Sequence, residues 1–565
     1  MKHLKFTLIL VCSIMAVNFS KAQTIEDGKK FLYYDKFISA KNVFQQLLTA
    51  NPNNDEAAYW LGQTLIAPDE DKDIEGAKAV YQKALAANPN SALLNAGMGH
   101  IELLEGKTAE ARNHFETALS LGGKNNVEVL DAVGFANGDF DSKFGDASYA
   151  VEKLKMATET KKFKDAKVMT DLGDAYRKMG DGGNAQASYQ EAMKMDPNYA
   201  RAAYRLGRIY QSQGTAQEQL YIKYYNDAIA MDPNYTKVYW TLYQYFYETD
   251  VVKSAAYLDK YLGAKGSDET NACFLNAQMK FAQGLFAEAL TSSDNCISAS
   301  ATPYPNLYGL KAYAAVKLGD TMNAKNSFEK YFQVQKPNKI GPRDYATYAS
   351  VLWGFPGNEA KVAEYIDKAV SLDSVNSNKA GYLKWLAGEY VKKKNYAEAA
   401  NLYGRVISVK PNYSNVDLFN AGYNFYLSDK YDSSNRYFTL YTEKYPDDIL
   451  GYYMLGNGYS VIDSTGALGL AIPYFNKVIE IGEKDTTKST TITRLKVAYK
   501  FFIGYYFNVK KDKDSALLYV NKALALDPTD ESMISNKEFI LKTDPNAPPK
   551  QAAKKSQAPS SPKKK

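Results

Sequence analysis

Apolar and polar residues alternate along this chain with the period of an amphipathic helix. In the clearest stretch, Val168, Leu172 and Tyr176 follow one another at intervals of four residues, so they fall on one face of a helix. A short polar, glycine-containing stretch follows at residues 178–183, and a second apolar stripe begins at Ala185. Because the connection is so short, the two helices must pack antiparallel. The pattern therefore predicts a helical hairpin.

The same hairpin recurs along the chain with small residues at the same places. A glycine lies in the middle of the first helix at Gly28, Gly62, Gly173, Gly207 and Gly504. An alanine lies near the start of the second helix at Ala40, Ala77, Ala185, Ala399 and Ala516. A glycine inside a helix costs about 1 kcal/mol relative to alanine. Its recurrence therefore predicts positions at which two helix backbones approach closely and a larger side chain would clash.

A proline closes most of these hairpins. These prolines are Pro52, Pro89, Pro197, Pro233, Pro411 and Pro528. Proline fits the first turn of a helix but disrupts a helix interior. We therefore expect each proline to end the second helix of one hairpin and to start the first helix of the next.

This order of glycine, alanine and proline resembles the tetratricopeptide repeat, most clearly in the residues Leu172-Gly173, Tyr176, Ala185, Tyr189 and Asp196-Pro197. The resemblance implies an all-α fold, a right-handed α-solenoid of antiparallel helix pairs with about 13–14 units. Residues 23–235 and 376–542 are predicted to form an N-terminal and a C-terminal repeat array. Residues 236–375 fit poorly, as degenerate helical repeats, so both true repeats and a hinge remain open for them.

The N-terminal end of the chain differs from its middle. Residues 1–22 carry Lys2 and Lys5 ahead of a short apolar run at 6–17, followed by small residues up to Ala22. This pattern predicts a signal peptide cleaved near Ala22, with a membrane anchor as the alternative. We therefore expect the protein to be periplasmic or otherwise exported. No later stretch is apolar enough to predict a transmembrane helix.

The C-terminal end, residues 543–565, is rich in lysine and proline and is predicted to be disordered. Its positive charges suit an anionic surface or a glycan, and a solubilising extension is the alternative. The whole chain has a net charge of +6, but the lysines of the two ends supply it. The segment between them is nearly neutral, so we expect no nucleic-acid partner.

Motifs that carry chemistry are scarce. The chain has three histidines, too few for a histidine-rich metal site or several acid–base centres. No nucleophile motif or phosphate-binding loop lies in a suitable context, so the sequence predicts no enzyme, no cofactor and no metal site. Beyond the leader, two cysteines remain, Cys273 and Cys296. They lie near the start of one predicted helix and the end of its partner, and both a disulfide and two buried thiols remain open.

The resemblance also implies that the first helix of each pair lines the concave surface of the solenoid. Residues of these helices that lie off the packing stripe are therefore candidates for binding a partner: Tyr204, Arg208, Phe419, Tyr423, Tyr426, Tyr453, Phe501 and Tyr505. Tyrosine offers a large amphipathic contact area at low entropic cost. Packing of these rings between neighbouring units is the alternative.

Two hypotheses for the function follow. The first is a non-enzymatic scaffold of the bacterial cell envelope, which binds a segment of another exported or outer-membrane protein, or an envelope complex, on its concave surface. The second is an envelope protein that binds a glycan or polysaccharide through a tyrosine-rich groove and the basic tail.

Overall fold

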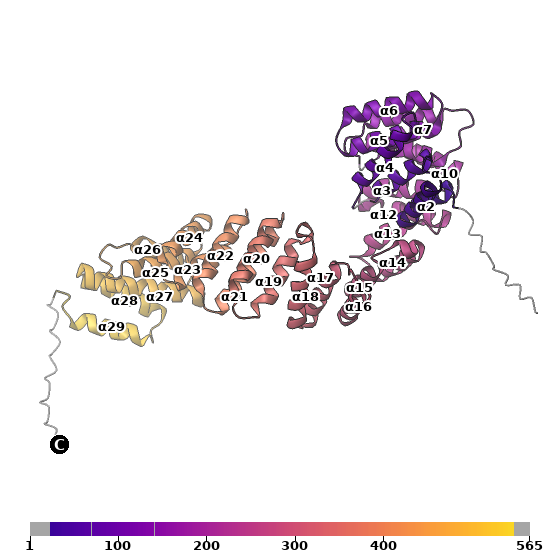
Figure 1. The fold of residues 1–565 in the computed structure, drawn as a ribbon. Coiled ribbons are helices and arrows are strands. Elements are labelled where there is room, and N and C mark those ends of the chain that lie inside the picture. Colours follow the sequence, from indigo (N-terminus) through magenta and orange to yellow (C-terminus); the bar gives the residue numbers. More distant parts are fainter. Residues whose placement is uncertain (1–22, 69–70, 140–141, 547–565) are drawn as a thin grey trace, which may run out of the picture. The chain divides into compact units, whose positions relative to one another are not determined.

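A computed structural model describes residues 23–68, 71–139 and 142–546 (Figure 1). The predicted signal peptide and residues 547–565 of the predicted tail lie outside these residues. The described residues form 29 α-helices and contain no β-strand. The chain divides into two compact units, unit 1 (Met1–Leu318) and unit 2 (Gly319–Lys565). This boundary falls inside the segment 236–375, which is helical on both sides of it.

The helices of unit 1 follow one another through short connections. They are α1 (Ile25–Tyr33), α2 (Phe37–Ala50), α3 (Asp55–Ile66), α4 (Ile74–Ala87), α5 (Ala92–Leu104), α6 (Thr108–Gly122), α7 (Val127–Gly138), α8 (Ala147–Thr158), α9 (Ala166–Lys178), α10 (Gly182–Met195), α11 (Ala200–Ser212), α12 (Glu218–Met231), α13 (Thr236–Phe246), α14 (Val251–Lys265), α15 (Ala272–Ala282), α16 (Phe286–Ala299) and α17 (Asn306–Leu318).

The helices of unit 2 are α18 (Thr321–Val334), α19 (Pro342–Trp353), α20 (Glu359–Leu372), α21 (Asn376–Lys392), α22 (Tyr396–Val409), α23 (Asn415–Leu427), α24 (Tyr431–Lys444), α25 (Ile449–Ile462), α26 (Ile472–Gly482), α27 (Ser489–Gly504), α28 (Lys513–Leu526) and α29 (Glu531–Lys542). Within the described residues, no helix of either unit is both long enough and apolar enough to cross a lipid bilayer.

Successive helices pack as pairs, from α1 with α2 to α15 with α16 in unit 1, and from α19 with α20 to α27 with α28 in unit 2. Within each unit, each pair also packs against the next, so the apolar stripes of neighbouring pairs are buried together. The predicted α-solenoid of antiparallel helix pairs is thereby confirmed.

The glycines of the first helices face aromatic rings of the second helices. A Cβ on Gly28, Gly62, Gly173 or Gly207 would overlap the ring of Phe44, Tyr81, Tyr189 or Tyr225, respectively. The alanines Ala40, Ala77, Ala185, Ala399 and Ala516 are fully buried. The expectation of close backbone approach therefore needs correction, because a ring from the partner helix fills the space above each of these four glycines.

Gly504 does not belong to this set. A Cβ built on it would meet only Asn508 Nδ2, at 3.9 Å. Directly after Gly504, α27 continues into a π-helical turn at Tyr505–Lys510. The prediction that Gly504 is a packing position is therefore wrong.

The prolines end helices but do not start them. Each of the six follows directly after the C-cap residue of a second helix, as Pro52 follows Asn51. The next helix begins three or four residues later, as α3 does at Asp55, where the Asn54 side chain accepts the amide hydrogen of Ala57. The predicted helix start at proline is wrong, because a short turn separates each proline from the next helix. A capping side chain starts that helix after Pro52, Pro411 and Pro528, but not after Pro89, Pro197 and Pro233.

Candidate functional site

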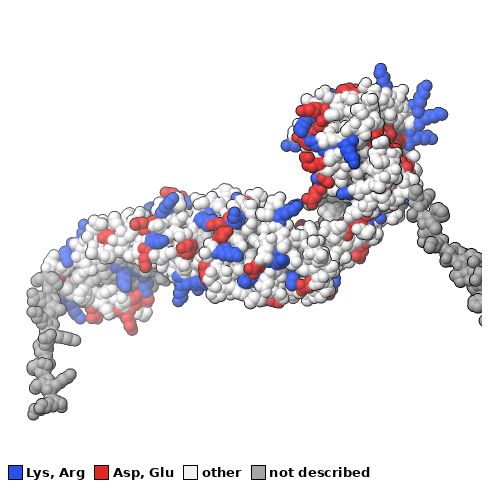
Figure 2. Space-filling model, viewed as in Figure 1, with Lys and Arg blue, Asp and Glu red and all other residues white. Residues whose placement is uncertain are grey.

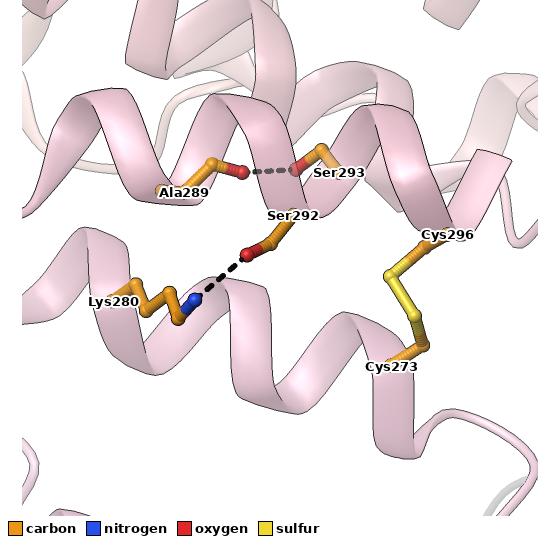
Figure 3. The surroundings of a disulfide bond; sticks show 6 residues. All are labelled: Cys273, Lys280, Ala289, Ser292, Ser293 and Cys296. Carbon is orange, nitrogen blue, oxygen red and sulfur yellow. Dashed lines mark hydrogen bonds between the residues drawn. A yellow bond between two sulfur atoms is a disulfide. The ribbon is translucent and has the colours of Figure 1, made fainter. Parts of the chain in front are cut away.

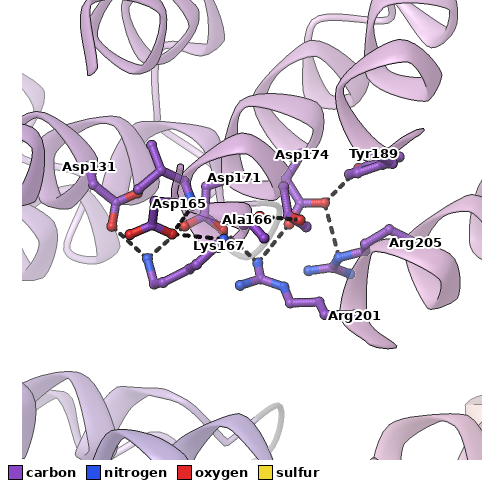
Figure 4. A network of polar contacts seen from close by, with 11 residues as sticks. Asp131, Asp165, Ala166, Lys167, Asp171, Asp174, Tyr189, Arg201 and Arg205 are labelled. Atoms are coloured by element: carbon purple, nitrogen blue, oxygen red, sulfur yellow. Dashed lines mark hydrogen bonds and ion pairs between the residues drawn. The ribbon is translucent and has the colours of Figure 1, made fainter. Parts of the chain in front are cut away.

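The first helices of unit 1 contact one another along the array, as α3 does with α5, α5 with α7, and α7 with α9. They carry a network of charged side chains, which begins at Lys167 on α9 (Figure 4). Lys167 Nζ lies 2.5 Å from Asp131 Oδ2 on α7 and 2.7 Å from Asp171 Oδ2 on its own helix. One ammonium group therefore bridges two buried carboxylates.

The network continues onto α11. Arg201 lies 2.8 Å from both Asp171 and Asp174, and Arg205 Nε lies 3.0 Å from Asp174 Oδ1. Tyr189 of α10 donates a hydrogen bond of 2.6 Å to the same oxygen of Asp174. Acidic and basic groups thus alternate from α7 to α11 (Figure 4).

The two carboxylates that share Lys167 differ in their electrostatics. Burial raises the pKa of Asp131 to about 7, and Lys167 only partly opposes this shift. Burial also favours the protonated form of Asp171. The positive charges of Lys167 and Arg201 outweigh this effect, so the pKa of Asp171 is lowered. Asp171 is therefore the ionised member of the pair, and Asp131 binds a proton readily.

Little free volume remains beside this network. A cavity of about 10 Å³ is lined by side chains that include Phe135, Asp171, Asp174 and Arg205. Such a volume holds about one water molecule. These charged groups are therefore satisfied mainly by one another, and this part of unit 1 is not an open groove.

The predicted partner-binding residues have different environments. Tyr204 is 7% exposed, packs in the core of unit 1, and forms a hydrogen bond of 3.1 Å to the Thr241 hydroxyl. The prediction that it binds a partner is wrong, because its ring fills the space between neighbouring helix pairs. Arg208 is half-buried on the same helix.

In unit 2 the predicted rings are mostly half-buried. Phe501 packs 4.9 Å from Phe475 and 6.2 Å from Tyr505, and Tyr426 packs 5.4 Å from Tyr431. Tyr453 lies under the Arg494 guanidinium, which is 6.0 Å from its ring centroid. These rings contribute to the packing within and between pairs while keeping part of their surface exposed.

Tyr423 differs from these rings, because it is 37% exposed and lies in a row of apolar side chains on α23. We call this row the α23 stripe; it consists of Val416, Phe419, Tyr423 and Leu427. Their spacing places them on one helix face, opposite the buried Leu418, Ala421 and Phe425. Three of the four members are exposed and Phe419 is half-buried.

Val416 and Leu427 were not predicted as binding residues, although both share the helical spacing of Phe419 and Tyr423. The signal was present in the sequence as a second apolar stripe on a helix that already has a buried one.

A cleft of about 700 Å³ lies elsewhere in unit 2, where the turn before α25 meets the turn before α27. Its lining contains three basic residues, Lys444, Lys488 and Arg494, and three acidic residues, Asp447, Asp448 and Asp485. The visible face of unit 2 likewise has acidic and basic side chains interspersed (Figure 2). The charges of the lining residues therefore cancel in number.

Cys273 and Cys296 are joined by a disulfide (Figure 3). Cys273 lies at the start of α15 and Cys296 near the end of α16, and their Cα atoms are 5.9 Å apart. A hydrogen bond of 3.0 Å from Lys280 Nζ to Ser292 Oγ joins the same two helices. The disulfide thus fixes the open end of the hairpin formed by α15 and α16.

Among the described residues, no group of three or more potential metal ligands occurs.

Residues 170–236 match the family model of the tetratricopeptide repeat. This protein contains tetratricopeptide repeats. The matched segment runs from α9 to the start of α13 and includes most of the charged network. Tetratricopeptide repeats are in general non-catalytic and bind protein partners. No curated protein matches the sequence.

Several solved structures contain similar repeats. The C-terminal part of a tetratricopeptide repeat-containing protein from Cytophaga hutchinsonii is 22% identical, with a TM-score of 0.33, over 46% of this chain and 98% of that chain. Yeast Tom70 is 15% identical, with a TM-score of 0.32, over 72% of this chain and 95% of Tom70. MamA is 23% identical, with a TM-score of 0.23, over 30% of this chain and 98% of MamA. At these TM-scores the similarity says nothing about ligands.

Proposed function

We propose that this tetratricopeptide-repeat protein is a non-enzymatic scaffold of the bacterial cell envelope, and that unit 2 binds an apolar segment of another exported protein along the α23 stripe. The observation that carries this proposal is the exposure of three of the four stripe residues, Val416, Tyr423 and Leu427. A helix inside a solenoid needs one apolar face for packing, and α23 has that face at Leu418, Ala421 and Phe425. On the second apolar face only Phe419 packs on the core, against Phe438 of α24, and the other three side chains remain exposed.

The neighbouring helix α21 leaves room beside the stripe. Lys384 of α21 forms an ion pair of 2.5 Å with Asp417 of α23, so this face of α21 is turned towards α23. Gly381 and Gly388 flank Lys384 on the same face, and a Cβ on either would meet no atom within 4 Å. A partner segment can therefore lie against α23 without displacing side chains of α21.

The size of the stripe sets the size of the partner segment. Val416 and Leu427 are eleven residues apart, which corresponds to roughly 17 Å along a helix. A segment of this length offers three or four apolar side chains, as a short helix or an extended peptide. Each anchor that becomes fully buried contributes about 1.5–3 kcal/mol of transfer free energy.

Two observations support export. Residues 1–22 have the charge and apolar pattern of a signal peptide. The Cys273–Cys296 disulfide suits an oxidising compartment such as the periplasm. Fractionation of cells that produce the full chain tests this part, with N-terminal sequencing of the product. We expect a periplasmic protein that begins near Gln23, and a full-length cytoplasmic chain would contradict export.

The binding surface is tested with two leucine variants of the mature chain. Leu427→Asp places a charge in the α23 stripe, whereas Leu518→Asp places one on α28, where Leu518 is also exposed. Each variant captures partners from cross-linked envelope extract, and proteins and glycans are identified together. We expect a stoichiometric protein to be captured by wild type and Leu518→Asp and lost with Leu427→Asp. Equal capture by both variants, or glycan without protein, would contradict the proposal.

The basic tail is tested in the same experiment by deleting residues 543–565. We expect the protein partner to be retained, because the proposed surface lies on α23. Loss of all capture in the deletion variant would instead place the contact in the tail lysines.

A further inference from the structure

The cleft of about 700 Å³ in unit 2 has the size of a small-molecule site, since such sites measure about 300–1,000 Å³. Its acidic and basic residues are equal in number, but most of these charged groups already have partners within unit 2. The groups that have no partner therefore determine which ligand chemistry the cleft suits.

Two of the acidic residues in the lining are engaged in hydrogen bonds. Asp448 accepts one of 2.5 Å from the Tyr441 hydroxyl and one of 2.9 Å from the Leu450 amide at the start of α25. Asp485 accepts bonds of 3.0 and 2.5 Å from the amide and the hydroxyl of Thr487. The third acidic residue, on the turn before α25, is exposed to solvent and can remain hydrated.

Two of the three basic residues are engaged as well. Lys444 donates a hydrogen bond of 2.6 Å to the carbonyl oxygen of Tyr413, and its ammonium lies 4.1 Å from the centroid of that ring. Lys488 Nζ lies 3.6 Å from Asp485 Oδ2. Arg494 differs from both, because its guanidinium forms no hydrogen bond or ion pair with any residue that the structure describes. Arg494 is half-buried, so the cleft contains one positive group that lacks an anionic partner.

Two hydroxyl groups lie on the same side of the cleft as Arg494. Thr490 and Thr491 precede Arg494 by four and three residues on α27, so the three side chains share one helix face. Thr491 is 8% exposed, and across the described part of the chain its hydroxyl has no hydrogen-bond partner. A buried hydroxyl is usually hydrogen-bonded. The Thr491 hydroxyl is therefore a second donor that awaits an acceptor in the cleft.

The start of α27 favours negative charge at this place. Its N-cap residue, Lys488, provides no capping side chain, so the first amides of the helix are not satisfied by a side chain. These amides and the helix dipole attract an anionic group. The opposite lining is more apolar, since the half-buried Tyr445 and Ile481 lie there with Ile449, which is 8% exposed.

We propose that this cleft binds a small organic molecule that carries one carboxylate group beside an apolar body. Arg494 holds the carboxylate, because the guanidinium fork matches the two carboxylate oxygens. The Thr490 and Thr491 hydroxyls supply further hydrogen bonds, and Tyr445, Ile449 and Ile481 receive the apolar body. The site is separate from the α23 stripe, with which it shares no residue.

The three acidic residues of the lining limit the charge of the ligand. A phosphate group carries nearly two negative charges at neutral pH, and the carboxylates of Asp447, Asp448 and Asp485 would repel it more strongly than a single carboxylate. The cleft therefore suits a monocarboxylate better than a phosphate.

Ligand chemistry is tested with benzoate, benzamide, acetate and inorganic phosphate, titrated into the full mature chain and followed by nuclear magnetic resonance. We expect saturable binding of benzoate, and binding of benzamide about tenfold weaker, because benzamide has the same ring without the charge. Acetate should bind more weakly than benzoate, because it lacks the apolar body. Absence of saturable benzoate binding at millimolar concentrations, or phosphate binding as tightly as benzoate, would overturn the proposal.

The position of the site is tested with Arg494→Gln, for which Arg436→Gln is the matched control. Arg436 is an exposed arginine on α24 that lies outside the cleft and, within the described residues, has no ion-pair partner either. Arg494→Gln should weaken benzoate binding by about tenfold and leave benzamide binding nearly unchanged, whereas Arg436→Gln should change neither. Equal loss of benzoate and benzamide binding in Arg494→Gln would indicate a structural effect and overturn the role of its charge.

A measurement on the wild-type chain keeps the test independent of the folding of any variant. Phenylglyoxal modifies arginine side chains, and mass spectrometry of the peptides follows Arg494 and Arg436 separately. Benzoate should slow the modification of Arg494 several-fold and leave Arg436 unaffected, and benzamide at the same concentration should protect neither. If benzoate leaves the rate at Arg494 unchanged, Arg494 does not hold the carboxylate and the proposal is overturned.

Discussion

The ring of Tyr189 occupies the space in which a side chain on Gly173 would have to lie. Gly173 belongs to the first helix of its pair and Tyr189 to the second. The same relationship joins Gly422 with Phe438 and Gly456 with Phe475 in unit 2. Because the rings are buried and closely packed, these glycines cannot gain a methyl group without moving an aromatic side chain.

Gly173→Ala should therefore destabilise unit 1, although alanine is the better helix former. Overpacking a filled core costs about 1–3 kcal/mol, which exceeds the gain of about 1 kcal/mol from helix propensity. Gly388→Ala is the matched control, because Gly388 also lies inside a helix but has open space around its Cβ position. It should stabilise unit 2 by up to about 1 kcal/mol. Urea unfolding followed by circular dichroism measures both, and shifts of the same sign would contradict this account.

The repeat architecture was predictable from the sequence because its determinants are local. Gly173, Ala185 and Tyr189 lie within one helix hairpin, and their spacing alone indicates two antiparallel helices. The prolines marked the ends of the second helices correctly for the same reason. The predicted helix start at proline was wrong, because a short turn follows each proline before the next helix begins, and only some of these turns end on a capping side chain such as Asn54.

Features that depend on distant contacts were not predictable. The contact of Tyr34 with Asp232 arises only after small rotations have accumulated over several helix pairs, and no single pair encodes it. Tyr204 was misplaced for a related reason, since its burial depends on Thr241 of the next pair. The α23 stripe could have been found, because Val416 and Leu427 share the spacing of Tyr423 on one helix.

The Cys273–Cys296 disulfide should stabilise the α15–α16 hairpin. It closes a loop with a sequence separation of 23 residues, for which loop-closure entropy predicts about 3 kcal/mol. Cys273→Ser/Cys296→Ser should therefore speed hydrogen exchange in α15 and α16. Reduction of the wild-type protein should have the same effect and should not change the double variant further. Equal exchange in the oxidised and reduced wild type would contradict a stabilising role.

Asp131 should make the stability of unit 1 depend on pH. Its pKa in the folded protein is raised by burial to about 7, from about 3.9 in an unfolded chain. A raised pKa means that stability is fully present below the unfolded value and is lost as the pH rises through the folded value. Wild type should therefore lose stability relative to Asp131→Asn between pH 5 and pH 8, measured by urea unfolding at both values.

Asp417 provides the opposite case as a control. Burial acts against its ionisation, but hydrogen bonds from Lys384, Ser414 and Lys410 outweigh this and lower its pKa. A lowered pKa contributes stability above the unfolded value of about 3.9, and this stability is lost only at more acidic pH. The effect of Asp417→Asn should accordingly stay constant between pH 5 and pH 8. A constant effect of Asp131→Asn over the same range would show that Asp131 does not titrate there.

Replacing Tyr204 by alanine should destabilise the protein much more than replacing Tyr423, because Tyr204 is a core residue and Tyr423 a surface residue. Tyr204→Ala removes a buried ring and leaves a cavity, which costs about 3–5 kcal/mol for a large aromatic side chain. Tyr423 is 37% exposed, and its ring contacts mainly Phe419, whose centroid is 5.1 Å away, so Tyr423→Ala should cost far less. Unfolding midpoints of the two variants measure this difference. If Tyr423→Ala destabilised the protein as strongly as Tyr204→Ala, the α23 stripe would be part of the core. It would then not be available to bind a partner.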